Sequence, residues 1–205
     1  MAFKYDYTTI KNNLEKKGYY VRIFKNKKTA TEYMNQNINH RIVGIGGSVT
    51  IAEMGLFPVL SKHNTVYWHD QKPENMTMME TRSAAARADV YISSVNGISE
   101  LGEIVNIDNT GNRVAAISYG PSKVYLVIGV NKITSDLDLA IYRARNIAAP
   151  LNAQRLKKKI PCAINGDKCY DCKSPERICR NISILLHKPS GADYEIIFID
   201  EDLGY

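Results

Sequence analysis

Residues 43–50 read Val-Gly-Ile-Gly-Gly-Ser-Val-Thr, and this stretch decides the fold. Its first residues are mostly apolar and predict a short buried strand. The two adjacent glycines then permit a tight turn, and the serine is a favoured N-cap for a helix that starts directly after it. A strand followed at once by a helix is the repeating unit of α/β proteins.

The same alternation extends through most of the chain. We predict strands at residues 19–24, 41–45, 65–68, 88–93, 123–130, 183–186 and 195–199, and helices at residues 7–17, 28–36, 49–55, 73–86 and 136–148. The run 123–130 is the most apolar and is expected at the centre of the sheet. The fold class is therefore α/β, with a mainly parallel sheet and helices on both of its faces.

Two local features complete this prediction. Residues 103–107 and 113–118 look like a β-hairpin closed by the turn at 109–112. Pro150 is expected to end the helix that begins at residue 136, because the residue before a proline is disfavoured in a helix. The segment 150–180 is then a small appended element of a single domain, residues 1–205, since it is too short to bury a core of its own.

The composition indicates an ordinary globular protein, because 44% of its 205 residues are hydrophobic and 23% are charged. No apolar run of about eighteen residues is present, so we expect no membrane partner. Residues 1–6 lack the apolar core of a signal peptide, which predicts a cytoplasmic location.

The net charge of +6 comes partly from two basic runs, residues 25–28 and 155–159. A nucleic-acid surface would also need aromatic residues between the charges, and these are lacking. We therefore interpret the runs as solvated faces and expect no nucleic-acid partner. A basic rim would still attract anionic substrates.

All four cysteines lie in one short stretch with the spacing C-x6-C-x2-C-x6-C. In a reducing compartment such thiols indicate a metal rather than disulfides, which an exported protein would form instead. One C-x2-C pair flanked by single cysteines suits an iron–sulfur cluster (4Fe-4S), and Zn²⁺ with four thiolates is the alternative. Unliganded thiols are the third possibility. The predicted metal ligands are Cys162, Cys169, Cys172 and Cys179.

The glycine turn is also a candidate anion site. Glycines let the backbone approach a ligand, and a helix N-terminus offers unpaired N–H groups and the positive end of a dipole. No lysine stands where a Walker A loop requires one, and a tight turn with a serine cap explains the same residues without a ligand. The candidates for binding a phosphate or a carboxylate are Gly46, Gly47, Ser48, Thr50 and, one helical turn further, Glu53.

Polar residues crowd the stretch 94–113, which follows a predicted strand, and α/β proteins bind ligands at strand ends. Glu100 or Asp108 would be a general base, and Arg113 would clamp a carboxylate. A plain turn at 109–112 accounts for part of this polarity. The candidates for ligand binding in this stretch are Asn96, Asn109, Thr110, Gly111 and Asn112.

The glycine turn and several longer segments together resemble the LUD (lactate-utilisation domain) family. The segments are Asn-Ile-Asp-Asn-Thr-Gly-Asn-Arg at 106–113, the stretches 119–124, 129–133 and 143–150, and the cysteine stretch that opens with Pro161. The resemblance spans residues 5–205 and is strongest to the cysteine-bearing branch of the family. It adds Gly120 and Lys132 to the expected ligand-binding residues.

The resemblance implies a three-layer α/β sandwich like that of ribose-5-phosphate isomerase and the CoA transferases, whose Gly-Gly-Ser loop holds phosphate or CoA groups, with a small C-terminal metal-binding element that contains the four cysteines. Family members of the lactate-utilisation type act with iron–sulfur partner proteins in oxidising L-lactate to pyruvate. The catalytic Asp and Lys motifs of the isomerases are not clearly present here, so the resemblance does not extend to isomerase activity.

Three hypotheses about function follow. The leading one is a protein that binds a small anionic metabolite, a hydroxy or keto acid, and works beside an iron–sulfur redox system with iron–sulfur partner proteins. The second is a transferase or isomerase for a phosphorylated or CoA-linked substrate, and the third is a non-catalytic accessory subunit. Fold analogy suggests a homodimer.

Overall fold

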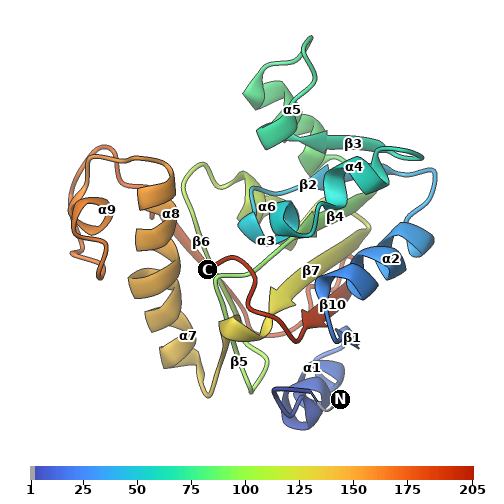
Figure 1. Cartoon of the computed structure of the whole chain (residues 1–205), viewed down its shortest axis with the longest axis horizontal. Helices are drawn as coiled ribbons and strands as arrows, with labels where there is room; N and C mark the ends of the chain where they lie inside the picture. Colours follow the sequence, from blue (N-terminus) through green and yellow to red (C-terminus); the bar gives the residue numbers. More distant parts are fainter. Residues whose placement is uncertain (1–2) are drawn as a thin grey trace.

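Six parallel strands form the central sheet, in the order β1-β10-β7-β4-β2-β3. A computed structural model describes residues 3–205 of the chain (Figure 1). Met1 and Ala2 lie outside these residues. They are the first part of the segment 1–6, from which we predicted that the chain has no signal peptide. The six strands are β1 (Tyr20–Phe24), β2 (Ile42–Ile45), β3 (Thr65–Trp68), β4 (Val90–Ser93), β7 (Lys123–Gly129) and β10 (Asp193–Ile199).

Strands β7 and β10 occupy the middle of this sheet, as the apolar run 123–130 predicts. They pair along seven positions, from Lys123 opposite Asp193 to Gly129 opposite Ile199. Their side chains are buried on both faces of the sheet almost throughout. A strand buried on both faces needs apolar residues without polar alternation, which is what these two sequences contain.

Helices cover the sheet on both sides and make it the middle layer of a three-layer sandwich. The core under one face includes residues of α1 (Thr8–Lys16), α5 (Met78–Ala86) and α6 (Asn112–Ser118). The core under the other face includes residues of α2 (Lys27–Asn37), α3 (Val49–Glu53) and α4 (Leu56–Leu60). The predicted α/β fold class with a mainly parallel sheet is therefore confirmed.

A second sheet was not predicted. It has four strands in the order β8-β5-β6-β9, namely β8 (Ile133–Thr134), β5 (Gly97–Ser99), β6 (Ile104–Asp108) and β9 (Asn181–Leu185). The predicted hairpin is wrong, because β6 pairs with β5 and β9, whereas residues 112–118 form α6. Gly111, in the left-handed conformation with φ +88°, turns the chain from the strand into this helix.

Pro150 does not end a helix, contrary to the prediction. Helix α7 (Leu137–Arg143) continues through a wider π-helical turn, residues 144–148, into α8 (Ala149–Arg155). Proline removes one hydrogen bond and crowds the preceding turn of an ordinary helix, and the wider turn next to it accommodates both effects. No helix among residues 3–205, this one included, combines the length and the apolar character needed to cross a membrane.

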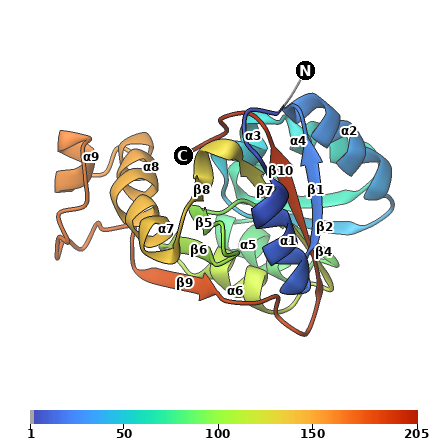
Figure 2. The same cartoon turned by 90° about the horizontal axis from the view of Figure 1, so that it is seen from below.

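The cysteine stretch follows α8 and lies at the outside of the molecule (Figures 1 and 2). It contains one short helix, α9 (Pro161–Asn165), and an otherwise irregular loop to residue 180. A small apolar cluster of Ala153, Ile160 and Ile178 anchors this loop on α8, with Cys162 and Cys172 packed against it. None of these residues belongs to the two large cores of the central sheet.

Candidate anion-binding site

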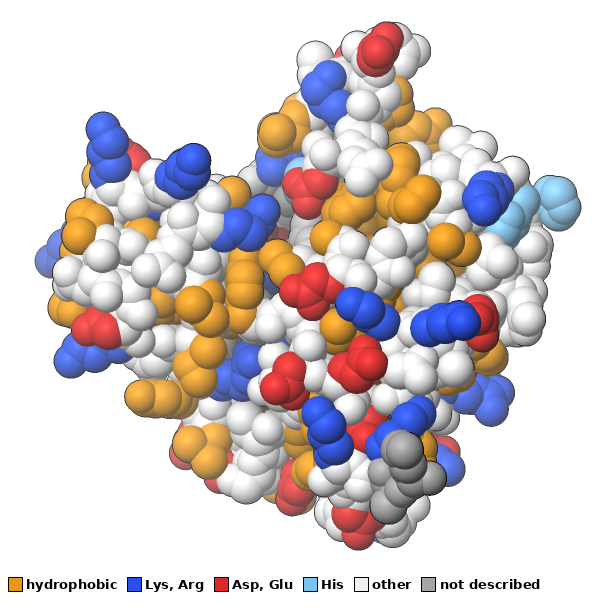
Figure 3. All heavy atoms as spheres, viewed as in Figure 1, with side chains coloured by type: hydrophobic (Ala, Val, Ile, Leu, Met, Phe, Trp, Pro, Cys, Tyr) orange, Lys and Arg blue, Asp and Glu red, His pale blue; other side chains and the backbone are white. Residues whose placement is uncertain are grey.

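A cavity of about 260 Å³ opens at the edge of the central sheet where its parallel strands end. The loops that follow β2, β4, β7 and β10 converge there, as loops do at the carboxyl ends of parallel strands. Figure 3 shows the surface hollowed between the part of the molecule that carries α5 and the part that carries α8, and both helices contribute to the cavity wall. The glycine turn and the Asp108–Arg113 loop therefore face one cavity.

The glycine turn lies at one side of this cavity, with Gly47, Ser48 and Thr50 in its wall. The Ser48 hydroxyl caps α3 by accepting a hydrogen bond from the Ile51 N–H at 3.3 Å, as predicted. Gly46 packs beneath the turn, where a Cβ would lie 2.8 Å from the Tyr91 hydroxyl. The serine and Gly46 therefore have structural roles that need no ligand.

Arg113 borders the cavity, but its guanidinium group is already engaged with the protein. It is buried, and burial lowers its pKa. Its hydrogen bonds hold the start of α6 against β6 and the loop after β4. They run to the backbone oxygens of Ser94 (3.2 Å) and Ile107 (2.6 Å) and to the side-chain oxygens of Asn96 (3.1 Å) and Asn106 (2.6 Å). The remaining donor, Nε, lies 4.0 Å from the Asp108 carboxylate, so a clamp on a substrate carboxylate would have to displace a protein partner.

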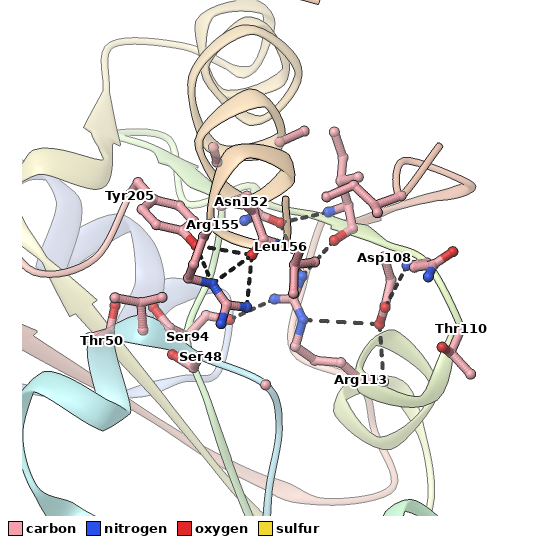
Figure 4. A pocket seen from close by; sticks show the side chains of 18 of the residues that line it. Ser48, Thr50, Ser94, Asp108, Thr110, Arg113, Asn152, Arg155, Leu156 and Tyr205 are labelled. Atoms are coloured by element: carbon pink, nitrogen blue, oxygen red, sulfur yellow. Dashed lines mark hydrogen bonds and ion pairs between the residues drawn. The ribbon is translucent and has the colours of Figure 1, made fainter. Parts of the chain in front are cut away.

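Asp108 is engaged in a similar way. Its carboxylate accepts hydrogen bonds from the backbone N–H groups of Asn109 (2.7 Å), Arg113 (3.0 Å) and Val114 (3.1 Å). These bonds satisfy donors at the start of α6 that have no partner within the helix. Asp108 thus shapes the cavity wall (Figure 4), and its role as a base stays a prediction.

The remaining predicted residues divide into two groups. Asn96, Asn109, Thr110 and Asn112 line the cavity, although the Asn96 side chain already accepts bonds from the Ile107 N–H and from Arg113. Four others do not line it. Glu100 accepts a hydrogen bond from the Tyr5 hydroxyl, Glu53 accepts one from the Gly204 N–H, Gly111 caps α6, and Gly120 follows that helix.

Lys132 ends a short 3₁₀ helix, residues 130–132, directly after β7, and it borders the cavity. Only 2% of the residue is exposed, and its amine donates hydrogen bonds to the hydroxyls of Thr50 (2.8 Å) and Ser94 (2.9 Å). Burial is the main cause that lowers its pKa, to about 7, and the nearby Arg143 and Arg113 charges lower it further. The two hydroxyls place the amine between the loops after β2 and β4.

His69 and Arg82 also line the cavity, although neither was predicted from the sequence. His69 follows β3, and burial lowers the pKa of its ring. Within residues 3–205 the buried His69 Nδ1 and Arg82 Nε have no hydrogen-bond partner. The other ring nitrogen of His69, Nε2, lies 3.7 Å from the Asp70 carboxylate, and both unpartnered atoms are enclosed by the protein, so they do not by themselves mark a ligand.

Arg155, Asn152 and Tyr205 form a further part of the wall (Figure 4). The Arg155 guanidinium donates to the Asn152 side-chain oxygen at 3.1 and 3.0 Å and to the Tyr205 hydroxyl at 2.8 Å. Arg155 opens the second basic run of the sequence, so that run is more than a solvated face at this residue. Four Lys or Arg side chains and two Asp side chains line the cavity, which therefore favours an anion.

The thiols lie in one loop, but among residues 3–205 no group of three or more His, Cys, Asp and Glu side chains is arranged to hold a metal. Cys162 and Cys172 nonetheless pack against the same small apolar cluster, and burial and the charges of the other three cysteines raise the pKa of Cys162. Arginine N–H groups lie at two sulfurs, with Arg177 3.4 Å from the Cys179 Sγ and Arg145 4.0 Å from the Cys169 Sγ. The donor set suits a thiolate-bound metal in its chemistry, and the metal stays a prediction.

The chain is thus an α/β protein of three layers, with a cationic cavity at the ends of its parallel strands. The chain belongs to the LUD domain family, whose family model matches residues 7–199. The resemblance stated above is thereby confirmed at the level of the family.

Among solved structures the chain is similar to a DUF162 family protein from Deinococcus radiodurans, with 13% sequence identity, a TM-score of 0.52, and coverage of 93% of this chain and 94% of that chain. At this identity the likeness shows the fold alone. The chain also matches eIF2B beta from Chaetomium thermophilum at 17% identity, over 65% of this chain and 44% of that chain, but the TM-score of 0.32 supports no argument. No curated protein matches.

Proposed function

We propose that the cavity binds a small organic anion, a hydroxy or keto acid. The observation that supports this most directly is the charge of the cavity wall, in which four Lys or Arg side chains stand against two Asp side chains. A carboxylate accepts hydrogen bonds at two oxygens and would pair with cationic side chains such as Arg82 through charge-assisted bonds.

The size of the cavity favours a small ligand. Its volume of about 260 Å³ is below the roughly 300 Å³ at which pockets for drug-sized ligands begin. An acid of three or four carbons would fit inside, whereas most of a CoA molecule would have to lie outside. The phosphorylated or CoA-linked substrates of the second hypothesis are therefore the comparison ligands in the test.

The test is a thermal-unfolding screen with lactate, pyruvate and glyoxylate, beside a sugar phosphate and CoA. A bound ligand at a hundred times its dissociation constant stabilises the folded state by about 2.7 kcal/mol, so we expect the acids to raise the melting temperature. The Arg82→Gln variant is expected to lose most of that shift. Arg87→Gln is the matched control, because Arg87 is exposed at the end of the same helix and does not line the cavity.

The outcomes separate the hypotheses. Stabilisation by CoA or the sugar phosphate alone would favour a transferase or isomerase. Binding of an acid without turnover in any reconstituted system would favour an accessory subunit. If none of these ligands shifts the melting temperature, or if both arginine variants keep the full shift, the cavity is not the binding site we propose.

We further propose that Cys162, Cys169, Cys172 and Cys179 hold an iron–sulfur cluster, as in the cysteine-bearing branch of the family, and that the protein serves lactate utilisation. The place of the loop supports this, because Ile178, next to Cys179, lines the cavity and the Arg180 N–H donates to the Asp108 carbonyl at 3.0 Å. When bound, such a cluster supplies one-electron transfer. The residues around it would compensate its negative charge, since Arg145 and Arg177 already approach two of the sulfurs.

Anaerobic purification followed by metal analysis and absorption spectroscopy tests this part. We expect iron and sulfide with broad visible absorbance, and loss of that absorbance in Cys169→Ala. The control is Lys168→Ala, an exposed neighbour without a thiol. Zinc without iron in anaerobic material would contradict the redox role and leave the anion site untouched.

A further inference from the structure

The hydrogen bonds of Lys132 leave one direction at its amine without a partner. A neutral amine has two N–H donors and one lone pair, and the two donors are used by the Thr50 and Ser94 hydroxyls. The Thr50 hydroxyl donates its own proton to the Leu203 carbonyl at 3.2 Å, so its oxygen acts as the acceptor for the amine. The lone pair is therefore the part of Nζ left for a ligand in the cavity.

The charged form of the same amine has no carboxylate within ion-pair distance, and Glu53 favours that form only as a more distant charge. Lys132 forms no ion pair among residues 3–205, where other lysines do, such as Lys123 with Glu195 at 3.0 Å. The charged groups that influence it from the surrounding elements are Arg143 on α7, Arg113 on α6 and Glu53 on α3. Two of these three are cations, and the amine is buried, so the neutral form is favoured.

We propose that Lys132 is a nucleophile that forms a Schiff base with the carbonyl carbon of an oxo acid held in the cavity. This inference rests on the proposed anion site and narrows its ligand to carbonyl-bearing anions. A lysine whose pKa is near 7 is neutral in half of the molecules at neutral pH, whereas an ordinary lysine is almost entirely protonated. Buried lysines with such a shift serve as Schiff-base nucleophiles.

The reaction balances without an oxidant or a reductant. The Nζ lone pair forms a bond to the carbonyl carbon while the carbonyl π pair moves to its oxygen, which gives a carbinolamine after one proton passes from nitrogen to oxygen. The remaining N–H proton then passes to that oxygen, which leaves as water while the nitrogen electron pair forms the C=N bond. The hydroxyls of Thr50 and Ser94, each within hydrogen-bond distance of Nζ, are placed to pass the protons.

The test is reductive trapping of the intact protein with glyoxylate or pyruvate and cyanoborohydride, followed by peptide mapping. We expect one adduct per chain at Lys132, formed at least about tenfold faster than at Lys123, because the neutral amine is the reactive form. The trapping rate at Lys132 is expected to rise with a midpoint near pH 7. Mapping of the wild-type chain needs no variant, so a folding defect in Lys132→Met would not obscure the result.

The failures are distinguishable. If the oxo acids raise the melting temperature but no adduct maps to Lys132, the Schiff base is excluded and the anion site remains. If adducts spread over surface lysines with no preference for Lys132, the inference also fails. If the acids neither stabilise the protein nor become trapped, both the inference and the proposed anion site fail. Lys123→Arg is the control variant and is expected to leave the trapping at Lys132 unchanged.

Discussion

Lys132 shows how one buried side chain can connect stability with chemistry. It ends the 3₁₀ turn that follows the most apolar strand, β7, and its amine donates to hydroxyls from α3 and from the loop after β4. The fold thus keeps an amine away from water without a carboxylate in ion-pair contact, which is unfavourable for the protonated form. Such strain in a cavity is typical of functional sites.

This placement predicts a pH-dependent stability. The pKa of Lys132 in the folded chain is about 7, below the roughly 10.4 of an unfolded lysine, so between these values the unfolded state binds more protons. The contribution of Lys132 to the free energy of unfolding therefore rises with pH across this interval and is least favourable below pH 7. In Lys132→Met this pH-dependent part of the free energy of unfolding is expected to vanish. The variant should therefore exceed the wild type in stability by the largest amount below pH 7. Urea unfolding of both proteins at several pH values measures it, and parallel pH profiles would contradict the assignment.

Arg113 is a second residue whose shape matters as much as its charge. Its hydrogen bonds reach four acceptors in two segments, the loop after β4 and strand β6, which a planar fork can do and a single ammonium group cannot. We expect Arg113→Lys to lower the free energy of unfolding by about 2–3 kcal/mol, because buried acceptors lose their donors. Arg87→Lys, at an exposed position, is expected to change it by less than about 0.5 kcal/mol. Denaturant unfolding measures the free energy of unfolding of both variants. Equal changes in the two would mean that the hydrogen bonds of Arg113 do not contribute to stability.

At the scale of elements, the approach of β2 to α5 depends on one glycine. A Cβ at Gly44 would lie 2.1 Å from the Ala85 carbonyl oxygen, a backbone atom that cannot turn aside. Gly44→Ala is therefore expected to destabilise the protein by about 3 kcal/mol, at the upper end of overpacking effects. Gly191→Ala is the matched control, because its Cβ would meet nothing within 4 Å. Urea unfolding measures both variants. If Gly44→Ala lowers the free energy of unfolding only slightly, α5 moves away from β2 easily.

The elements of the central sheet could be predicted from the sequence, because each depends on a local pattern. The helix start at Ser48 follows from the N-cap residue, and the strand Thr65–Trp68 from a short β-branched and aromatic run between polar residues. The second sheet could not be predicted in this way. Its strand β6 pairs with β9, more than seventy residues away, and no local pattern records that partner.

The candidate site was predictable to a similar extent. Ser48, Thr50 and Asp108 follow strands in the sequence and do face one cavity, since parallel strands end at one edge. The same rule applied to Trp68 and Ser93 would have identified His69 and Ser94. Arg82 and Asn152 lie on helices that only the tertiary packing brings to the cavity, and no sequence signal marks them.

At the scale of the whole molecule, the protein consists of a large central sandwich and a smaller outer part. Two apolar cores fill the sandwich, one on each face of the sheet. The helix from α7 through α8 connects it to the cysteine loop, which has its own small apolar cluster. The cavity lies where these parts meet, so its wall contains residues of the sandwich, of α8 and of the loop.

This division predicts how metal removal affects the molecule. The only tryptophan, Trp68, is buried in one large core, where its ring centroid lies 5.7 Å from that of Phe57. Its fluorescence therefore reports the unfolding of the sandwich. The cysteines lie outside both large cores, and a metal there would stabilise mainly its own loop. We expect a chelator to change the free energy of unfolding, measured by Trp68 fluorescence in urea, by less than about 0.5 kcal/mol. Amide hydrogen exchange within residues 161–180 should become much faster in the same sample.

The matched control for that experiment is the variant Cys169→Ala without chelator, which should show the same fast exchange in the loop and an unchanged Trp68 midpoint. A large fall in the Trp68 midpoint on chelation would mean that the metal loop and the sandwich unfold as one cooperative unit. Since the two parts share the cavity wall through Ile178, the bound acid is the one ligand expected to couple them. Addition of the acid should therefore slow exchange on both sides of the cavity, and protection confined to the sandwich would show that the loop takes no part in binding.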